Sequence, residues 1–177
     1  MNCVRSLMTT QLLFITSAST NAPFVRWTRN KLLACVAVVR HNMQIVKIGS
    51  NSEFLKLEIP SEFSSEGWAQ ISAEINTNNF HGNISPWIEE ADVYNFFNSL
   101  EELYKSLKGT ASFEPREEQF TFKLEAKSGG HIEVAGAAWS EACYGSKLEF
   151  CFLLDQTFLS EPLKRLELLV SQLKANA

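Results

Sequence analysis

The stretch FTFKLEAKSGGHIEVAGAA, residues 120–138, has the clearest pattern in the chain. Phe120, Phe122 and Leu124 alternate with polar residues, and the alternation resumes at Ile132 after a turn that contains two glycines. A period of two residues is typical of a strand with one buried face, and two such runs joined by a short glycine turn predict an antiparallel hairpin. We therefore expect the fold to contain an antiparallel sheet.

Further short strands are predicted on both sides of this hairpin. The most regular is residues 68–76, in which Ala69, Ile71 and Ala73 would point to one face and Trp68 to the other. Turn-forming residues such as Gly, Ser and Asn separate the remaining candidates. These candidates are residues 43–48, 54–59, 80–84 and 148–154.

Two segments have the period of an amphipathic helix instead. In residues 93–107 the apolar side chains recur at intervals of three and four, which places them on one stripe. Acidic residues precede this stripe and lysines follow it, as the helix dipole favours, and Gly109 is expected to supply the left-handed stop. A second apolar stripe spans residues 159–173, with Ser160 as its expected N-terminal cap.

These elements together predict an α+β protein. Strands that follow one another through turns, and not through helices, favour an antiparallel sheet over a doubly wound one. Neither an internal repeat nor a low-complexity linker interrupts residues 43–177. The expected fold is a single domain of residues 43–177, an antiparallel β-sheet with two amphipathic helices packed on one face.

Charge divides the chain near residue 42. The first 42 residues contain five basic side chains and no acid, whereas residues 43–177 contain 11 basic and 20 acidic side chains, a net charge of −9. A basic leader of this kind fits a secretory signal, a mitochondrial transit peptide or an upstream extension assigned in error. We favour the extension, with the true start at Met43 and residues 1–42 poorly ordered, because regular hydrophobic patterning begins at Met43.

The usual signatures of catalysis and cofactor binding are missing from the sequence. It contains no G-x-S-x-G, G-x-x-x-x-G-K-[ST] or H-E-x-x-H motif and no G-x-G-x-x-G that opens a helix. Its four cysteines and three histidines lack the spacing of a zinc site. We therefore expect no enzymatic activity, no cofactor and no metal.

The same composition restricts the possible partners. No apolar run approaches the roughly 20 residues that a membrane-spanning helix needs, and the acidic excess of residues 43–177 disfavours nucleic acid. A basic protein is the expected partner, contacted by tryptophans and glutamates at outward strand positions. In a cleft, such glutamates could instead form an acid–base pair. The candidate contact residues are Trp68, Glu74, Glu125, Glu133, Trp139 and Glu149.

Several segments resemble the WapI-like immunity proteins of bacterial contact-dependent toxin systems. They include LKG at residues 107–109, GHIEVAG at residues 130–136 and, most specifically, DQTFL at residues 155–159. Asp155, Gln156 and Thr157 lie where the last strand meets the last helix. We expect a structural role there, with the Asp155 carboxylate accepting backbone N–H groups.

The resemblance implies a non-enzymatic antidote that binds the toxic C-terminal domain of a partner, often a nuclease, in the cytoplasm. We expect such a protein to be a monomer or a weak homodimer. Two other classes remain open. A small-ligand carrier or minor enzyme would have a deep apolar cavity with His81 or His131 beside a carboxylate, and a structural subunit would have a large self-complementary apolar patch.

Overall fold

The computed structural model describes residues 43–142 and 144–176. The predictions for residues 1–42, poor order and a true start at Met43, concern a segment outside these described residues. Within these described residues, antiparallel strands form the larger part of the regular structure, together with two α-helices of 17 residues each and two short 3-10 turns. The α+β class predicted from the sequence is therefore confirmed.

The strands form three sheets, not the single sheet predicted. One four-stranded sheet has the order β1 (Met43–Gly49), β2 (Phe54–Pro60), β4 (Ser72–Thr77), β5 (Phe80–Ile84). The second contains β7 (Thr110–Phe113), β8 (Phe120–Ala126), β9 (His131–Glu141) and β10 (Tyr144–Asp155), in that order. A small two-stranded sheet pairs β3 (Trp68–Gln70) with β6 (Trp87–Glu89).

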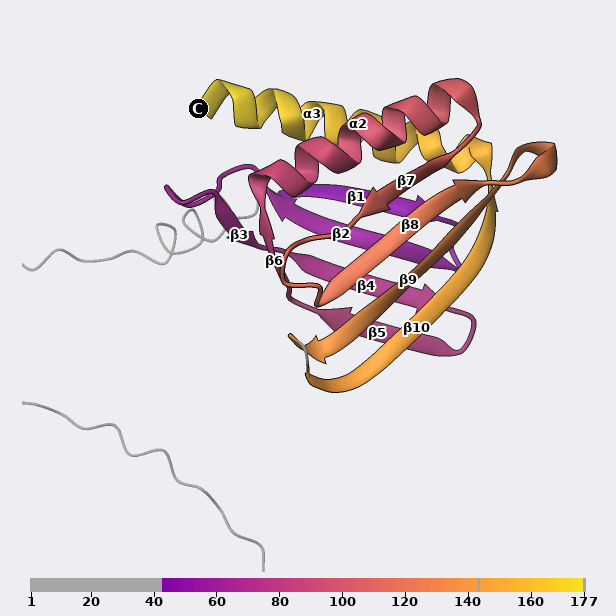
Figure 1. Ribbon diagram of the computed structural model, residues 1–177, viewed down its shortest axis with the longest axis horizontal. Coiled ribbons are helices and arrows are strands. Elements are labelled where there is room, and N and C mark those ends of the chain that lie inside the picture. The colour runs from indigo at the N-terminus through magenta and orange to yellow at the C-terminus, as the bar shows by residue number, and fades with distance from the viewer. Residues whose placement is uncertain (1–42, 143, 177) are drawn as a thin grey trace, which may run out of the picture.

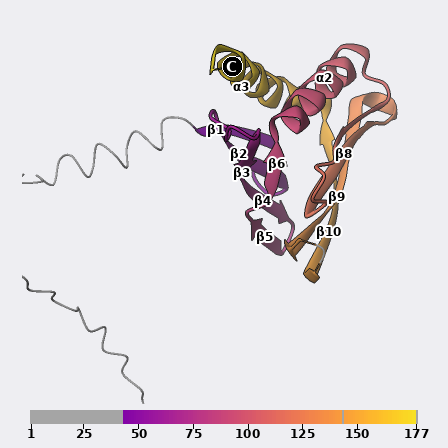
Figure 2. The same cartoon turned by 60° about the vertical axis from the view of Figure 1, so that its left-hand side comes forward.

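The two four-stranded sheets face each other like the sides of a wedge (Figure 1, Figure 2). They come together where β5 contacts β9 and β4 contacts β10, and they diverge toward β1 and β7. The prediction of one sheet was wrong because alternation shows that a strand has one buried face, but not which strand it pairs with.

The helices α2 (Glu90–Ser106) and α3 (Ser160–Asn176) lie across the open side of the wedge (Figure 2). α2 packs against β7, α3 packs against β1, and the helices contact each other. Their buried residues join those of both large sheets in one hydrophobic cluster. The helices thus close a core between two sheets, and the predicted packing on one face of one sheet is not observed.

Four antiparallel strands followed by a helix occur twice along the chain. β1, β2, β4 and β5 precede α2, and β7 to β10 precede α3. The sequence shows no matching repeat, since this backbone path requires only alternating apolar residues in the strands and an apolar stripe on the helix.

The predicted strand at residues 68–76 is divided at Ile71. Ala69, Ile71 and Ala73 are all buried, so the predicted alternation is confirmed. The first part of the segment pairs with β6 and the second with β2, and the Ile71 N–H donates to the Pro86 carbonyl at 3.0 Å. The side-chain pattern hides the break because both parts bury the same face.

Helix α2 has nearly the predicted limits, but a different residue stops it. At its start the Glu89 N–H donates to Asp92 Oδ2 at 2.8 Å in a capping box. At its end Leu107 has a φ of 51° and its N–H donates to the Leu103 carbonyl at 2.8 Å. Leu107 is therefore the left-handed residue that ends the helix, whereas Gly109, with a φ of 85°, lies in the link to β7.

The hairpin at residues 120–138 forms as predicted. β8 and β9 pair in antiparallel register, and the short 3-10 turn η1 (Ser128–Gly130) joins them. The prediction that Ser160 caps the last helix is wrong. The Ser160 hydroxyl donates to the Thr157 carbonyl at 3.3 Å, because the 3-10 turn η2 (Gln156–Leu159) has already begun the helical path.

Candidate functional site

The six predicted contact residues lie on three separate surfaces. Four of them lie on the outer side of the β7–β10 sheet, between inward-facing apolar neighbours: Glu125, Glu133, Trp139 and Glu149. Glu74 lies on the outer side of the other large sheet, and Trp68 lies on β3. Trp68 and Trp139, both expected at outward positions of a single sheet, lie on different sheets, because the strand of Trp68 pairs with β6.

Two of the predicted glutamates share one lysine. Glu125 and Glu133 are directly opposite each other, and Lys127 Nζ lies 2.8 Å from Glu125 Oε1 and 3.4 Å from Glu133 Oε1. The hydrogen bond from Lys127 lowers the pKa of Glu125, and the same bond raises the pKa of Lys127. An acid–base pair would need one carboxyl protonated, whereas this arrangement favours the ionised form of Glu125.

The other predicted residues on the large sheets are also paired. Lys147 Nζ lies 2.6 Å from Glu149 and 5.3 Å from the ring centroid of Trp139. On the opposite sheet Lys56 Nζ lies 3.0 Å from Glu74. These neighbouring cations offset the negative potential that the glutamates alone would produce.

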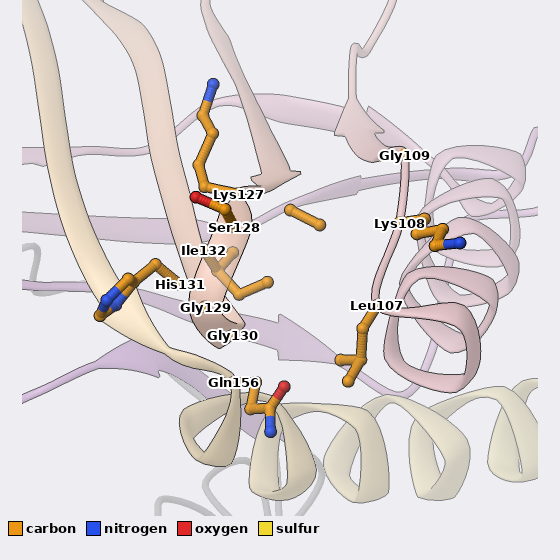
Figure 3. A pocket seen from close by; sticks show the side chains of 11 residues that line it. Leu107, Lys108, Gly109, Lys127, Ser128, Gly129, Gly130, His131, Ile132 and Gln156 are labelled. Atoms are coloured by element: carbon orange, nitrogen blue, oxygen red, sulfur yellow. The ribbon is translucent and has the colours of Figure 1, made fainter.

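A cavity of about 450 Å³ lies at one end of the β7–β10 sheet (Figure 3). Three parts of the chain meet around it: the end of α2 at Leu107 and Gly109, the β8–β9 turn at Gly130, and Gln156 of η2. These parts belong to the short segments on which the family resemblance rests. The tertiary structure therefore brings together residues that are 20 or more positions apart in the sequence.

The contact between Gln156 and Gly130 has a structural explanation. A Cβ at Gly130, which has a φ of 80°, would lie 3.2 Å from Gln156 Oε1, so the glycine makes room for the amide. Gln156 Oε1 is buried without a hydrogen-bond partner among the described residues. His131 also lines the cavity but is exposed, and Asp155 is its cross-strand neighbour.

Asp155 occupies the capping position expected from the sequence. Its Oδ1 accepts the Thr157 backbone N–H at 2.9 Å, and the residue itself is extended. This hydrogen bond lowers the pKa of Asp155, with a smaller contribution from His131. The carboxylate thus stabilises the turn that leads from β10 into α3.

We expect Asp155→Ala to lower the melting temperature by a few degrees at neutral pH, because the Thr157 N–H loses its acceptor. Since folding lowers the pKa of Asp155, its contribution is complete above the unfolded-state pKa and is lost as the pH falls through the folded-state pKa. Thermal melts of wild type and variant should therefore converge in acid. Asp155→Asn, which can still cap, is the control, and a neutral-pH difference that persists unchanged in acid would contradict this account.

A second hollow, of about 470 Å³, lies over the small β3–β6 sheet. In that sheet Trp68 is opposite Glu89 and Gln70 is opposite Trp87, so both indole rings lie on the same face. We call it the tryptophan hollow. Its lining residues are Ser64, Glu66, Trp68, Trp87 and Glu117.

Sequence reasoning found Trp68 but missed Trp87. The strand β6 has only three residues, which is too short to show an alternating pattern. The sequence offered one sign of this contact residue. Trp87 is a large aromatic residue between the end of β5 and the acidic start of α2.

An arginine of the chain itself rests on this face. The Arg116 guanidinium carbon lies 5.7 Å from the Trp68 ring centroid, and Nη1 lies 3.1 Å from Glu89 Oε1. Glu89 is also part of the α2 capping box with Asp92, whose pKa is raised mainly by burial. The face therefore combines aromatic rings with carboxylates in a way that binds a planar cation.

Comparison with protein families assigns the chain to a family. The model of the immunity protein WapI-like family matches residues 44–174, which is more than half of the sequence. The chain belongs to the WapI-like immunity protein family. The resemblance seen in the sequence is thereby confirmed.

Comparisons of this WapI-like protein with curated proteins and with solved structures assign no further family. No curated protein matches the chain. Crystal structures of MRP1/MRP2 from Trypanosoma bruciei are similar to it with 11% sequence identity and a TM-score of 0.46, over 85% of this chain and 97% of that chain.

Within residues 43–142 and 144–176, no helix has both the length and the apolar character needed to cross a membrane. In the same residues, His, Cys, Asp and Glu side chains form no group of three or more that could hold a metal ion.

Proposed function

We propose that this chain is a non-enzymatic immunity protein that binds and neutralises the toxic C-terminal domain of a cognate polymorphic toxin. The observation that carries the proposal is the match of the immunity family over residues 44–174. That range contains both large sheets except Met43, all of α2 and all but the last two residues of α3, so the resemblance involves the whole described core.

The charge of the protein supports a basic toxin, which we propose to be a nuclease acting in the cytoplasm. Residues 43–177 have a net charge of −9. A nuclease that holds polyanionic substrate needs clustered basic side chains, and long-range attraction between opposite charges accelerates encounter. The proposed complex is one immunity protein on one toxin domain, with the free protein a monomer or a weak homodimer.

Co-expression tests this function. We expect the full chain to restore growth of cells that produce the toxic domain encoded by the neighbouring reading frame. The association rate of the purified proteins should fall as salt is added, since screening removes the electrostatic attraction. Failure of a folded, well-expressed chain to restore growth or to bind that domain would contradict the proposal. Rescue by a chain that starts at Met43 would show that residues 1–42 are dispensable.

The cavity of Figure 3 supports a second candidate function, the binding of a small ligand. It has a suitable size and places His131 beside Asp155. The antidote is favoured because Asp155 already accepts the Thr157 N–H and His131 is exposed. A metabolite that binds saturably and raises the melting temperature, with loss of the effect in His131→Ala, would favour the ligand-binding function instead.

A further inference from the structure

We propose that the tryptophan hollow is the part of this immunity protein that receives an arginine side chain of the toxin. The inference rests on the proposed function and adds to it a location and a chemistry. It combines exposed aromatic area, carboxylates that form no ion pair with any described residue, and an internal arginine on the same face. Each of these observations is independent of the family match.

The hollow offers aromatic area that is not used in the core. Trp87 is 49% exposed, although its neighbour Ile88 is completely buried. Exposed tryptophan is costly in water and is among the residues most often found at the centre of protein interfaces. The half-buried Trp68 extends the same surface diagonally across the β3–β6 pair.

The carboxylates of the hollow differ from those of the large sheets. Glu66 and Glu117 are exposed and line the hollow, and within the described residues neither belongs to an ion pair. On the β7–β10 sheet, by contrast, the predicted contact glutamates are all paired with lysines. A positively charged partner would therefore gain more at the hollow than on that sheet.

The contact of Arg116 with Trp68 shows which cation this surface accepts. Its guanidinium lies over the indole while it pairs with Glu89, so ring and carboxylate are spaced for a planar group with several donors. The cation–π contacts found in the described residues involve Lys47, Arg116 and Lys147, and none of them uses Trp87. The ring of Trp87 is thus available for a second guanidinium, with Glu66 and Glu117 as its carboxylate partners.

The walls of the hollow are held in place by backbone hydrogen bonds. The Gly67 N–H donates to the Ser64 carbonyl at 2.8 Å, and the Ser64 N–H donates to the Trp68 carbonyl at 2.9 Å. On the other side the Glu118 N–H donates to the Pro115 carbonyl at 3.0 Å, which closes the turn that carries Glu117. A preformed site of this kind loses little conformational entropy on binding.

A peptide titration tests the chemistry without the toxin. The probe is an acetylated Gly-Arg-Gly-Arg amide, and its control is the same peptide with uncharged citrulline in place of arginine. We expect the arginine peptide to shift the indole N–H resonances of Trp87 and Trp68 in the full chain and to leave Trp139 unchanged, with no shift from the citrulline peptide. Equal shifts at Trp139, or no shift at Trp87, would overturn the proposal.

Two other occupants have their own signatures in the same spectra. A Trp87 resonance that shifts with protein concentration before any peptide is added would assign the hollow to a second copy. A Trp87 resonance that changes when residues 1–42 are cleaved from the chain would assign it to that basic segment. Either result would overturn the assignment to a toxin arginine.

Toxin binding then tests the location. Trp87→Ala should weaken the affinity for the toxin domain by about tenfold or more, as is typical of a central interface tryptophan. Glu117→Gln should also weaken it, by more than Glu102→Gln, which removes the same charge from an exposed position on α2. Leu168→Ala, at a residue 52% exposed on α3, is the control for loss of apolar area.

The outcomes separate this inference from the proposed function. If the wild-type chain does not bind or neutralise the toxin, the proposed function fails. If wild type binds but Trp87→Ala and Glu117→Gln bind equally well, the function stands and the inference is overturned. Melting curves establish that both variants are folded. Glu117 lies on an exposed turn, so we do not expect Glu117→Gln to unfold the protein.

Discussion

Replacement of Phe96 by alanine is expected to lower the free energy of unfolding by about 3–5 kcal/mol, as for other buried phenylalanines. Phe96 is 1% exposed and lies on the face of α2 that points into the wedge. Its ring is edge-on to Phe113 of β7, at 5.7 Å between centroids, and to Phe122 of β8, at 5.1 Å. The substitution would leave a cavity where the helix meets the second sheet.

Denaturant unfolding of the full chain measures this effect. Domains of this kind have a free energy of unfolding of only about 5–15 kcal/mol. We therefore expect a substantial fraction of Phe96→Ala molecules to be unfolded at 37 °C. Phe96→Leu should recover part of the loss, and Leu168→Ala, at an exposed position, should change the free energy by no more than about 0.5 kcal/mol. A Phe96→Ala change as small as that of Leu168→Ala would contradict the packing of α2 described above.

Replacement of Gly136 by valine should have the second largest effect. Gly136 lies in the middle of β9, directly between Phe122 of β8 and Phe150 of β10. A Cβ at this position would lie 2.6 Å from Phe150 Cζ and 2.7 Å from Phe122 Cβ, and closer still to the Thr121 carbonyl oxygen. Because the obstacle includes backbone, we expect a loss of about 3 kcal/mol in the free energy of unfolding.

The neighbouring residue supplies a matched control. Ala135 also lies in β9 but on the outer face, opposite Cys151 and Lys123. Valine suits an extended strand, so Ala135→Val should leave the stability nearly unchanged. Equal stability of Gly136→Val and Ala135→Val in the same denaturant titration would contradict this account, because it would show that the groups around Gly136, backbone included, can move aside.

The glycine also illustrates what a sequence pattern can omit. Within the alternation of Ile132 and Val134, Gly136 counts as a weak strand residue, since glycine inside a strand often marks close approach of another group. The structure identifies the approaching groups as the Thr121 carbonyl and the side chains of Phe122 and Phe150. No single-sequence pattern could pair them with Gly136, because the pairing depends on the register of three strands.

The candidate site was predictable only in part. Asp155 was placed correctly as a cap because capping is a local interaction between neighbours in sequence. The choice of Trp68 remains a prediction for toxin contact, as do the glutamates. The error was to place Trp68 and Trp139 in a single sheet, since alternation does not show that the chain changes sheets at Ile71.

The end of helix α2 was also predictable only in part. The sequence placed the end of α2 within two residues, because the apolar stripe ends there. It favoured Gly109, the residue for which a left-handed conformation has no steric cost, whereas the structure uses Leu107. In that conformation the Leu107 N–H donates to the Leu103 carbonyl, and the residue lines the cavity formed with the β8–β9 turn and η2.

By itself, the sequence determined which face of most strands and helices is buried, where the helices and the central hairpin lie, and that residues 43–177 are acidic. These properties depend on side-chain periodicity and on composition, both of which are local. The tertiary structure alone decided that most strands divide between two large sheets, that β3 leaves its neighbours to pair with β6 in a third, and that Trp87 joins Trp68. Those outcomes depend on which distant strands pair, and alternate burial is equally compatible with many pairings.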